Sequence, residues 1–197
     1  GIEPAGVIGH SMGEIAAAQV AGALDLHHAV RVICQRSRLM RQHAGLGAML
    51  LIELPATEVA ATLEDRTTGI AVAAINSPRT TIVSGNPTAV DALAASLSAR
   101  EVFCRRIEVD VASHSPQMDD LRIGLLTELA AVAPRQATIP MWSTVDGKWL
   151  RGPELDAGYW FRNLRQPVRL AEAVGQLSGE GFTAFVEISP HPILVPA

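Results

Sequence analysis

Apolar and polar positions divide the start of this chain into a short strand and two helices. Residues 5–8 form an apolar run typical of a buried strand, and residues 15–24 form an alanine-rich stretch that predicts a helix ending near Gly22. Apolar residues recur at helical spacing over residues 26–42, with arginines between them, and the glycines at 45 and 47 follow. The pattern therefore predicts strand, turn, helix, helix.

The middle of the chain has a different hydrophobic pattern, which predicts mainly strands. The predicted order is β-α-β-β-α-β, which is the split arrangement of a ferredoxin-like subdomain. We therefore predict an inserted ferredoxin-like subdomain over residues 47–110. Its expected elements are strands at 48–54, 70–76, 80–84 and 102–109, helices at 56–65 and 88–98, and a turn at 77–79.

The remaining residues, 1–46 and 111–197, are predicted to form an α/β core that is α/β-hydrolase-like, with a parallel sheet. Only ten residues precede Ser11, although a strand that leads to such a serine usually has neighbours on both sides. We therefore expect the N-terminal part of this core to be missing and the chain to be a fragment of something longer. The later elements expected are helices at 118–131 and 168–177, a helix or loop at 159–164, and strands at 141–144 and 184–188.

Composition excludes several classes of function. Hydrophobic residues make up 48% of the 197 residues, the net charge is −4 and no basic cluster stands out, which argues against nucleic-acid binding. Cys34 and Cys104 lie far apart without metal-ligand spacing, so free thiols and no metal are expected. With no apolar run of membrane-spanning length and no signal peptide, we expect a cytoplasmic protein without a membrane partner.

The turn between the first strand and the first helix carries the strongest chemical signal. It reads Gly9-His10-Ser11-Met12-Gly13, and strand, Gly-x-Ser-x-Gly, helix is the context of a nucleophile elbow. Neighbours without a Cβ let strand and helix pack closely, and the first N–H groups of the helix can hold an anion. The alternative is a glycine-rich helix start with an ordinary N-cap serine.

A serine nucleophile needs a base, and six histidines could supply it. His114 is the better candidate because it lies between two serines, in a loop at the return from the inserted subdomain. His191 also lies in a loop, whereas His10 adjoins the serine and is expected to point elsewhere. The alternative of a structural histidine stays open, and the three others, His27, His28 and His43, are interpreted as surface residues.

Arg36 is a candidate handle for a charged substrate. It lies on the second predicted helix, and an arginine fork pairs with a carboxylate through two hydrogen bonds. Its neighbours Arg31, Arg38 and Arg41 equally favour a solvated face of that helix. Spacing alone leaves both interpretations open.

Five ordered segments resemble the acyltransferase domains of modular type I polyketide synthases, which are relatives of malonyl-CoA:acyl-carrier-protein transacylases. The resemblance spans nearly the whole chain, with the inserted subdomain in its expected place. The segments are GHSMGE at 9–14, QRSRLM at 35–40, VASHS at 111–115, YWFRNLRQPVR at 159–169 and EISPHP at 187–192.

The resemblance implies a role for each matching residue. Ser11 would be the nucleophile, and His114 its general base and then the acid for the leaving thiol. Arg36 would hold the free carboxylate of a malonyl-type extender unit. The backbone N–H of Met12 would be one oxyanion donor. The backbone carbonyl of Asn163 would orient the histidine in place of the acid of a triad.

The resemblance also implies substrates and partners. Acyl-CoA would be the donor and the phosphopantetheine thiol of an acyl carrier protein the acceptor, with a ketosynthase domain in the same polypeptide and no permanently bound cofactor. Val111 and Ser113 precede the histidine, where family members differ with the extender unit. The small Ser113 favours methylmalonyl, with malonyl or ethylmalonyl as alternatives. His10 and His191 would lie near the pocket.

Two rival functions remain at this stage. A serine esterase or thioesterase would also carry an elbow and a late histidine, but it would not need Arg36. An inactive scaffold fragment of a megasynthase would take no acyl label on Ser11. The family's Gly-Gln-Gly loop, which supplies the second oxyanion donor, is absent from this sequence, so we expect low activity from this chain alone.

Overall fold

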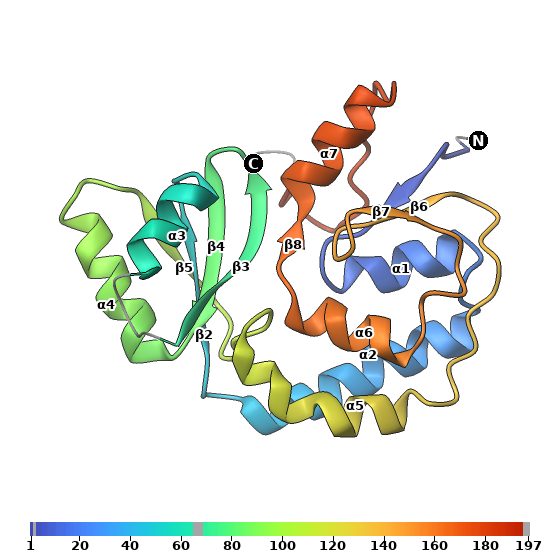
Figure 1. Ribbon diagram of the computed structural model, residues 1–197, viewed down its shortest axis with the longest axis horizontal. Helices are drawn as coiled ribbons and strands as arrows, with labels where there is room; N and C mark the ends of the chain where they lie inside the picture. The colour runs from blue at the N-terminus through green and yellow to red at the C-terminus, as the bar shows by residue number, and fades with distance from the viewer. Residues whose placement is uncertain (2, 65–68, 195–197) are drawn as a thin grey trace.

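The chain forms two lobes, each built around its own small sheet (Figure 1). A computed structural model describes residues 1, 3–64 and 69–194. In the lobe that holds the N-terminus, the strand order is β1-β6-β7, with β1 parallel to β6 and β7 antiparallel to it. The sheet of this part of the chain is therefore mixed, where a parallel one was expected. Its strands are β1 (Val7–Ile8), β6 (Met141–Ser143) and β7 (Lys148–Leu150).

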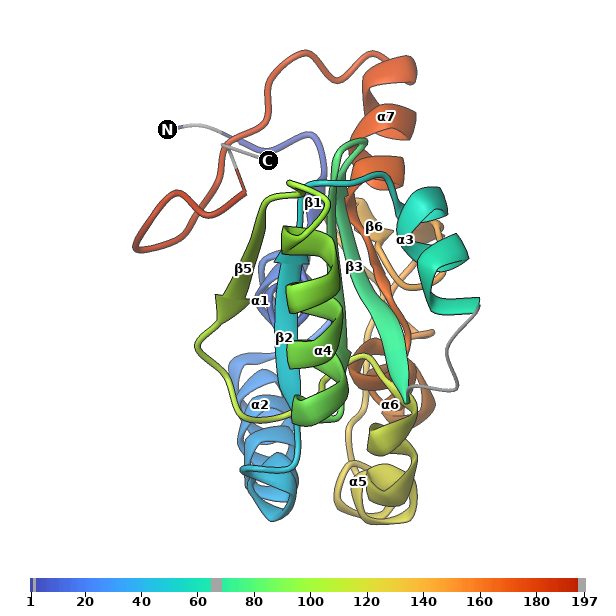
Figure 2. The same cartoon turned by 90° about the vertical axis from the view of Figure 1, so that its left-hand side faces the viewer.

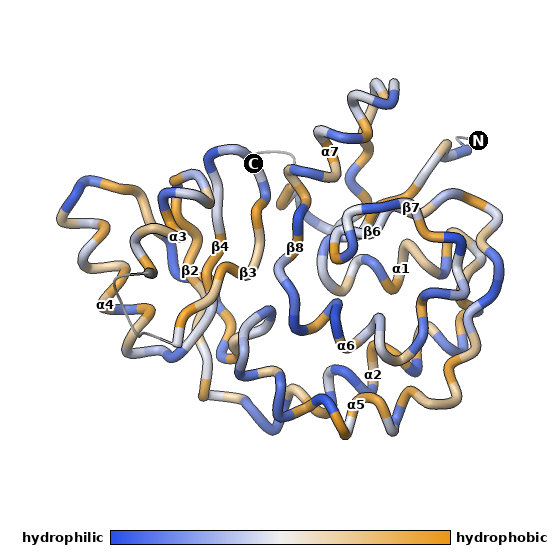
Figure 3. The backbone as a smooth tube through the Cα atoms, in the orientation of Figure 1, coloured by the Kyte–Doolittle hydropathy of each residue, from blue (hydrophilic) through white to orange (hydrophobic). Residues whose placement is uncertain are grey.

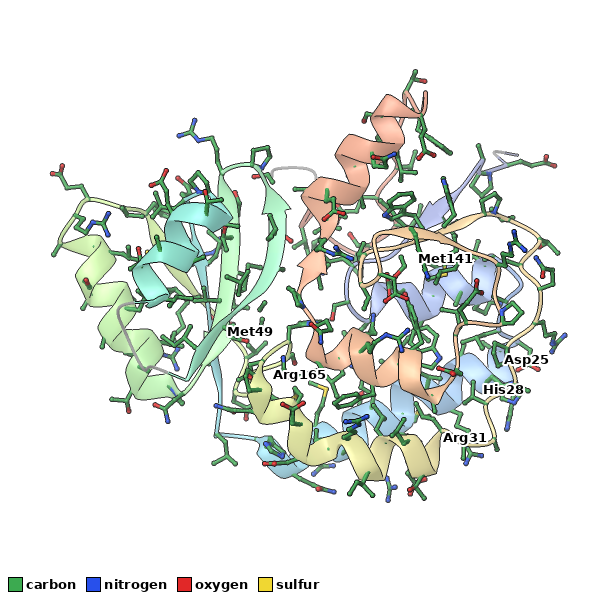
Figure 4. The ribbon with its side chains drawn as sticks, in the orientation of Figure 1. Asp25, His28, Arg31, Met49, Met141 and Arg165 are labelled. Carbon is green, nitrogen blue, oxygen red and sulfur yellow. The ribbon has the colours of Figure 1, made fainter. Side chains whose placement is uncertain are left out.

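Helices surround this first sheet and supply most of its core. Polar caps begin two of them, since the Asp25 carboxylate accepts from the His28 N–H and the Asp156 carboxylate accepts from the Tyr159 N–H. Figure 4 shows Arg31 reaching toward the neighbouring helix, where its Nε donates to the Glu128 carbonyl. The helices are α1 (Gly13–Val20), α2 (Leu26–Met40), η1 (Arg41–His43), η2 (Pro116–Leu121), α5 (Arg122–Glu128), α6 (Ala157–Arg165) and α7 (Leu170–Gly179).

The second lobe is a five-stranded sheet in the order β5-β2-β4-β3-β8. Its first four strands are antiparallel neighbours, and the chain runs through them in the expected β-α-β-β-α-β order. The fifth, β8, comes from the C-terminal part of the chain and pairs parallel to β3. The elements are β2 (Ala48–Ile52), α3 (Ala56–Glu64), β3 (Ile70–Ser77), β4 (Thr80–Gly85), α4 (Pro87–Ser98), β5 (Cys104–Ile107) and β8 (Val168–Arg169).

Alternation along β2 explains why this sheet is covered on both faces. Leu50 and Ile52 are buried against α3 and α4, which lie together on one face (Figure 2). Met49 and Leu51 pack on the other face, in a cluster with residues of the first lobe. Figure 4 labels Met49 on this side of the sheet. Figure 3 shows the hydrophobic colour of β2. The two lobes therefore meet across an apolar layer on the inner face of the sheet.

Three expected elements differ from those observed. The expected helix at 168–177 starts as strand β8, because Val168 pairs with Ala74 of β3. The expected helix at 118–131 starts as the 3-10 turn η2, with Pro116 in its first turn, and α5 ends at Glu128. Residues 184–188 form no strand, and Val186 and Ile188 are exposed with no pairing strand among the described residues. Residue 65, the expected end of α3, lies outside the described residues.

Candidate active site

The elbow holds Ser11 in a strained conformation between β1 and α1. Its φ is 53°, in the left-handed region that non-glycine residues rarely adopt. A Cβ on Gly9 would lie 2.2 Å from the backbone nitrogen of Glu14, so only glycine fits there. A Cβ on Gly13 would meet nothing within 4 Å, so the close packing expected of both glycines is required only of the first.

Folding brings Ser11 and His114 together from two distant parts of the sequence. The Oγ of Ser11 lies 2.8 Å from Nε2 of His114. This distance suits a hydrogen bond from the hydroxyl to the imidazole, which is the contact that a base needs. The two residues that the sequence proposed as nucleophile and base are therefore in direct contact.

The other ring nitrogen of His114 identifies the residue that orients it, and here the expectation from the resemblance was wrong. Nδ1 donates to the backbone carbonyl of Gln166 at 2.7 Å, not to that of Asn163. Gln166 follows α6 with φ −87° and ψ 156°, because a residue before proline is driven out of the helical region. Its carbonyl can therefore turn toward the histidine. The Leu164 carbonyl accepts from the backbone N–H of His114 as well.

This arrangement keeps the imidazole neutral. Burial, followed by the positive charge of Arg36, lowers the pKa of His114 from 6.5 to about 3. With Nδ1–H bound to a carbonyl, the lone pair of Nε2 is free to take the proton of Ser11. No carboxylate contacts the ring among the described residues, so the pair is a Ser-His dyad.

Arg36 points into the same site rather than toward solvent. It is only 3% exposed, and its Nη2 donates to Oγ of Ser11 at 3.2 Å. Its Nη1 donates to Oδ1 of Asn163 at 2.5 Å, and its buried Nε has no hydrogen-bond partner among the described residues. Burial lowers its pKa to about 10, so it is still a cation at neutral pH. The alternative of a solvated arginine face does not hold at this position.

Glu14 is the main residue of this site that the sequence analysis did not single out. It is fully buried in the first turn of α1, and burial raises its pKa. Its carboxylate accepts from the Tyr159 hydroxyl at 2.6 Å, from Nδ2 of Asn163 at 2.9 Å, and from the N–H and hydroxyl of Thr144. The available signal was an acid directly after the elbow, in a helix of which Gln19 is the other polar residue.

The loop before His114 is fixed to the second lobe. A Cβ on Gly47 would lie 1.9 Å from the backbone nitrogen of Ala112, so the loop and the start of β2 are in close contact. The Ser84 hydroxyl on β4 donates to the Ser113 carbonyl at 2.6 Å. Val111 packs against the core of the first lobe. The two residues expected to set specificity therefore lie where the lobes meet.

The remaining candidates are divided between the site and the surface. The backbone N–H of Met12 donates no hydrogen bond among the described residues, whereas those of the next three residues bond to elbow carbonyls. His10 points across to β3, where its Nε2 lies 2.9 Å from Oδ1 of Asn76, and burial lowers its pKa. His191 is exposed, and the structure does not bring it to the dyad.

The described residues hold neither a cluster of metal ligands nor a helix that could span a membrane. Across residues 1, 3–64 and 69–194, no three histidine, cysteine or acidic side chains gather as metal ligands do. In the same residues, none of the helices combines the length and apolar character needed to cross a bilayer.

Comparison with known proteins decides the family. The profile of the acyl transferase domain matches residues 1–197. The chain belongs to the acyl transferase domain family. Among curated relatives, it is 47% identical to erythronolide synthase EryA2 of Saccharopolyspora erythraea over 197 residues, 100% of this chain and 6% of that protein. It is also 47% identical to the pikromycin polyketide synthase component PikAIII of Streptomyces venezuelae, over 98% of this chain and 12% of that protein.

Solved structures of the family agree with this fold. The acyltransferase domain from module 8 of the salinomycin polyketide synthase matches with a TM-score of 0.97 at 46% identity, covering 98% of this chain and 46% of that one. The malonyl CoA-acyl carrier protein transacylase of Coxiella burnetii matches with a TM-score of 0.85 at 29% identity, covering 92% and 59%. The resemblance to acyltransferase domains of modular polyketide synthases is thereby confirmed, and the chain spans a small part of the curated relatives.

Proposed function

We propose that this chain transfers a carboxylated acyl unit from coenzyme A to the phosphopantetheine thiol of an acyl carrier protein, through an ester on Ser11. One observation carries the proposal. The Ser11 Oγ lies within hydrogen-bond distance of both the His114 imidazole and the Arg36 guanidinium. The reaction of a carboxylated thioester requires a nucleophile, a base for that nucleophile and a buried cation close together.

The first half of the reaction forms the ester. Nε2 of His114 takes the proton from Oγ of Ser11 as that oxygen bonds to the thioester carbonyl carbon. The N–H of Met12 donates to the resulting oxyanion. The carbon–sulfur bond then breaks, and the protonated His114 returns its proton to the sulfur of coenzyme A. The second half repeats these steps with the carrier thiol as nucleophile and Ser11 as leaving group.

Arg36 makes the site select donors with a free carboxylate. A buried guanidinium left without such a partner costs free energy, so an acetyl or propionyl donor is disfavoured. An esterase that hydrolyses simple acyl esters would not need the positive charge of Arg36. The neutral His114 and the carbonyl of Gln166 complete a dyad that needs no acid of a triad.

The choice among extender units rests on the loop before the histidine. Ser113 is small and leaves room for a methyl branch, whereas a phenylalanine there would fill the space. We therefore favour methylmalonyl over malonyl and ethylmalonyl. A single methylene is worth only about 1–3 kcal/mol in a pocket, so the preference is expected to be moderate.

The domain division belongs to the same proposal. Residues 47–110 would be the inserted ferredoxin-like subdomain, supported by the antiparallel strand order β5-β2-β4-β3. Residues 1–46 and 111–197 would form the hydrolase-like core. An acyl carrier protein and a ketosynthase domain of the same polypeptide would be its partners, and the relatives' membership of polyketide synthases supports both.

The test is mass spectrometry of the natural full-length protein after exposure to a panel of acyl-CoA donors. Methylmalonyl-CoA should add one acyl group at Ser11. When phosphopantetheinyl carrier protein is then added, that acyl group should move from Ser11 to the carrier thiol. Ser11→Ala is the matched control and should take no label. Labelling that is equal for carboxylated and simple donors, or hydrolysis in place of transfer, would favour the esterase alternative. No label would favour the scaffold alternative.

A further inference from the structure

The side-chain amide of Asn163 lies between the buried acid Glu14 and the buried Arg36 of this site. Oδ1 of Asn163 accepts from Nη1 of Arg36, and Nδ2 of the same amide donates to Oε2 of Glu14 at 2.9 Å. Glu14 is 0% exposed, and Arg36 is 3% exposed. The three side chains come from α1, α2 and α6, so this line of contacts exists only in the folded molecule (Figure 1).

The carboxylate of Glu14 is held by more than this amide. The Tyr159 hydroxyl donates to Oε2, while the N–H and hydroxyl of Thr144 donate to Oε1. Donors on both oxygens favour the ionised form of the acid and oppose burial, which has the larger effect and raises the pKa of Glu14. The negative charge in turn raises the pKa of Arg36, against the larger effect of burial.

The spacing matters because a direct ion pair between Glu14 and Arg36 would block the binding of a substrate carboxylate. A carboxylate touching the guanidinium would form the bidentate pair that a substrate carboxylate is meant to form. Here, two of the five guanidinium donors are used, on Asn163 and Ser11, and Nε has no partner among the described residues. Glu14 can thus balance the charge from a distance without occupying the binding edge.

We propose that Glu14 is the charge partner of Arg36 and that Asn163 is the spacer that keeps the two apart. Both are positioning residues, because they act through Arg36 rather than on the substrate. The proposal rests on the proposed function, in which Arg36 binds the carboxylate of the donor. It adds that preference for carboxylated donors depends on where the acid is placed, as well as on the arginine.

Two variants in the natural full-length protein test the placement of the charge. Glu14→Gln removes the acid. The double variant Glu14→Gln/Asn163→Asp exchanges acid and amide, so net charge and side-chain volume are kept while the carboxylate moves onto Arg36. Glu58→Gln, on the exposed face of α3, is the matched control for the loss of an acid. The measurement is kcat and KM for acylation by methylmalonyl-CoA and by propionyl-CoA.

We expect Glu14→Gln to lower the preference for methylmalonyl-CoA over propionyl-CoA by about tenfold or more, mainly through KM. The exchanged variant should lower it further, because its acid neutralises the guanidinium directly. Glu58→Gln should keep the original preference. A loss shared equally by the two donors in both variants, with or without unfolding, would overturn the proposal, as would an exchanged variant with the original preference.

Arg36→Ala separates this proposal from the proposed function. If that variant keeps its preference for carboxylated donors, then Arg36 is not the carboxylate-binding residue and the proposed function fails. If Arg36→Ala loses the preference while the two acid variants keep it, only the role of Glu14 and Asn163 fails.

Discussion

At the scale of single residues, the proposed reaction depends on the protonation state of His114. In the proposed mechanism, His114 acts as a base and must be neutral, the form that dominates above its pKa. Burial together with Arg36 lowers that pKa to about 3. A lower pKa extends the active range toward acid. We therefore expect kcat/KM for propionyl-CoA to stay level as pH falls through 6.5, until the protein unfolds.

Removing the nearby cation tests the same residue. In Arg36→Ala the repulsion between two positive groups is lost, so the pKa of His114 should rise and the acid limb of the kcat/KM profile should move to higher pH. Stopped-flow acylation with propionyl-CoA measures this limb without a carboxylate on the donor. Identical limbs near pH 6.5 in both proteins would show that the imidazole is not held as described.

The size of the residue before the histidine gives a third prediction. Ser113→Phe should lower kcat/KM for methylmalonyl-CoA relative to malonyl-CoA by about 10–200-fold, because the ring takes the volume of the methyl branch. Competition between the two donors, read by the mass of the acyl group on Ser11, measures the ratio. An unchanged ratio would remove Ser113 from the specificity loop.

At the scale of elements, the two glycines of the elbow differ in how closely other atoms pack against them. Gly9→Ala places a Cβ 2.2 Å from the Glu14 nitrogen, whereas Gly13→Ala places one in open space. We expect Gly9→Ala to destabilise the protein by about 3 kcal/mol or more, and Gly13→Ala to change stability little. Urea unfolding of both variants gives the comparison, and equal effects would contradict the described packing of β1 on α1.

Elements also show how far the sequence could be used to predict the structure. The elbow, α2 and the β-α-β-β-α-β order could be predicted because local periodicity and turn residues determine them. Strand β8 could not, since Val168 is recruited by β3 across the molecule. The role of Gln166 was missed because it depends on a carbonyl freed by the following proline. Glu14 was missed because its hydrogen-bond partners come from two distant segments, α6 and the residue that follows β6.

At the scale of the whole molecule, contacts between the two lobes hold the segments that carry Ser11 and His114. The Ser84 hydroxyl on β4 holds the Ser113 carbonyl, and His10 of the elbow contacts Asn76 of β3. Ser84→Ala should therefore cost about 1 kcal/mol of stability and lower kcat/KM several-fold, because the loop before the histidine is less firmly held. Thermal unfolding and acylation rates check this, with the exposed Ser98→Ala on α4 as control. Equal behaviour of the two variants would mean that the lobes are not coupled through this loop.

The central claim is that one buried cation makes this nucleophile choose carboxylated donors. The most direct measurement offers equal methylmalonyl-CoA and propionyl-CoA to the natural full-length protein and to its Arg36→Ala variant, and then weighs the acyl group on Ser11. We expect the methylmalonyl ester to dominate on the natural protein and the propionyl ester to dominate on the variant. The same ratio of esters on both proteins would contradict the account.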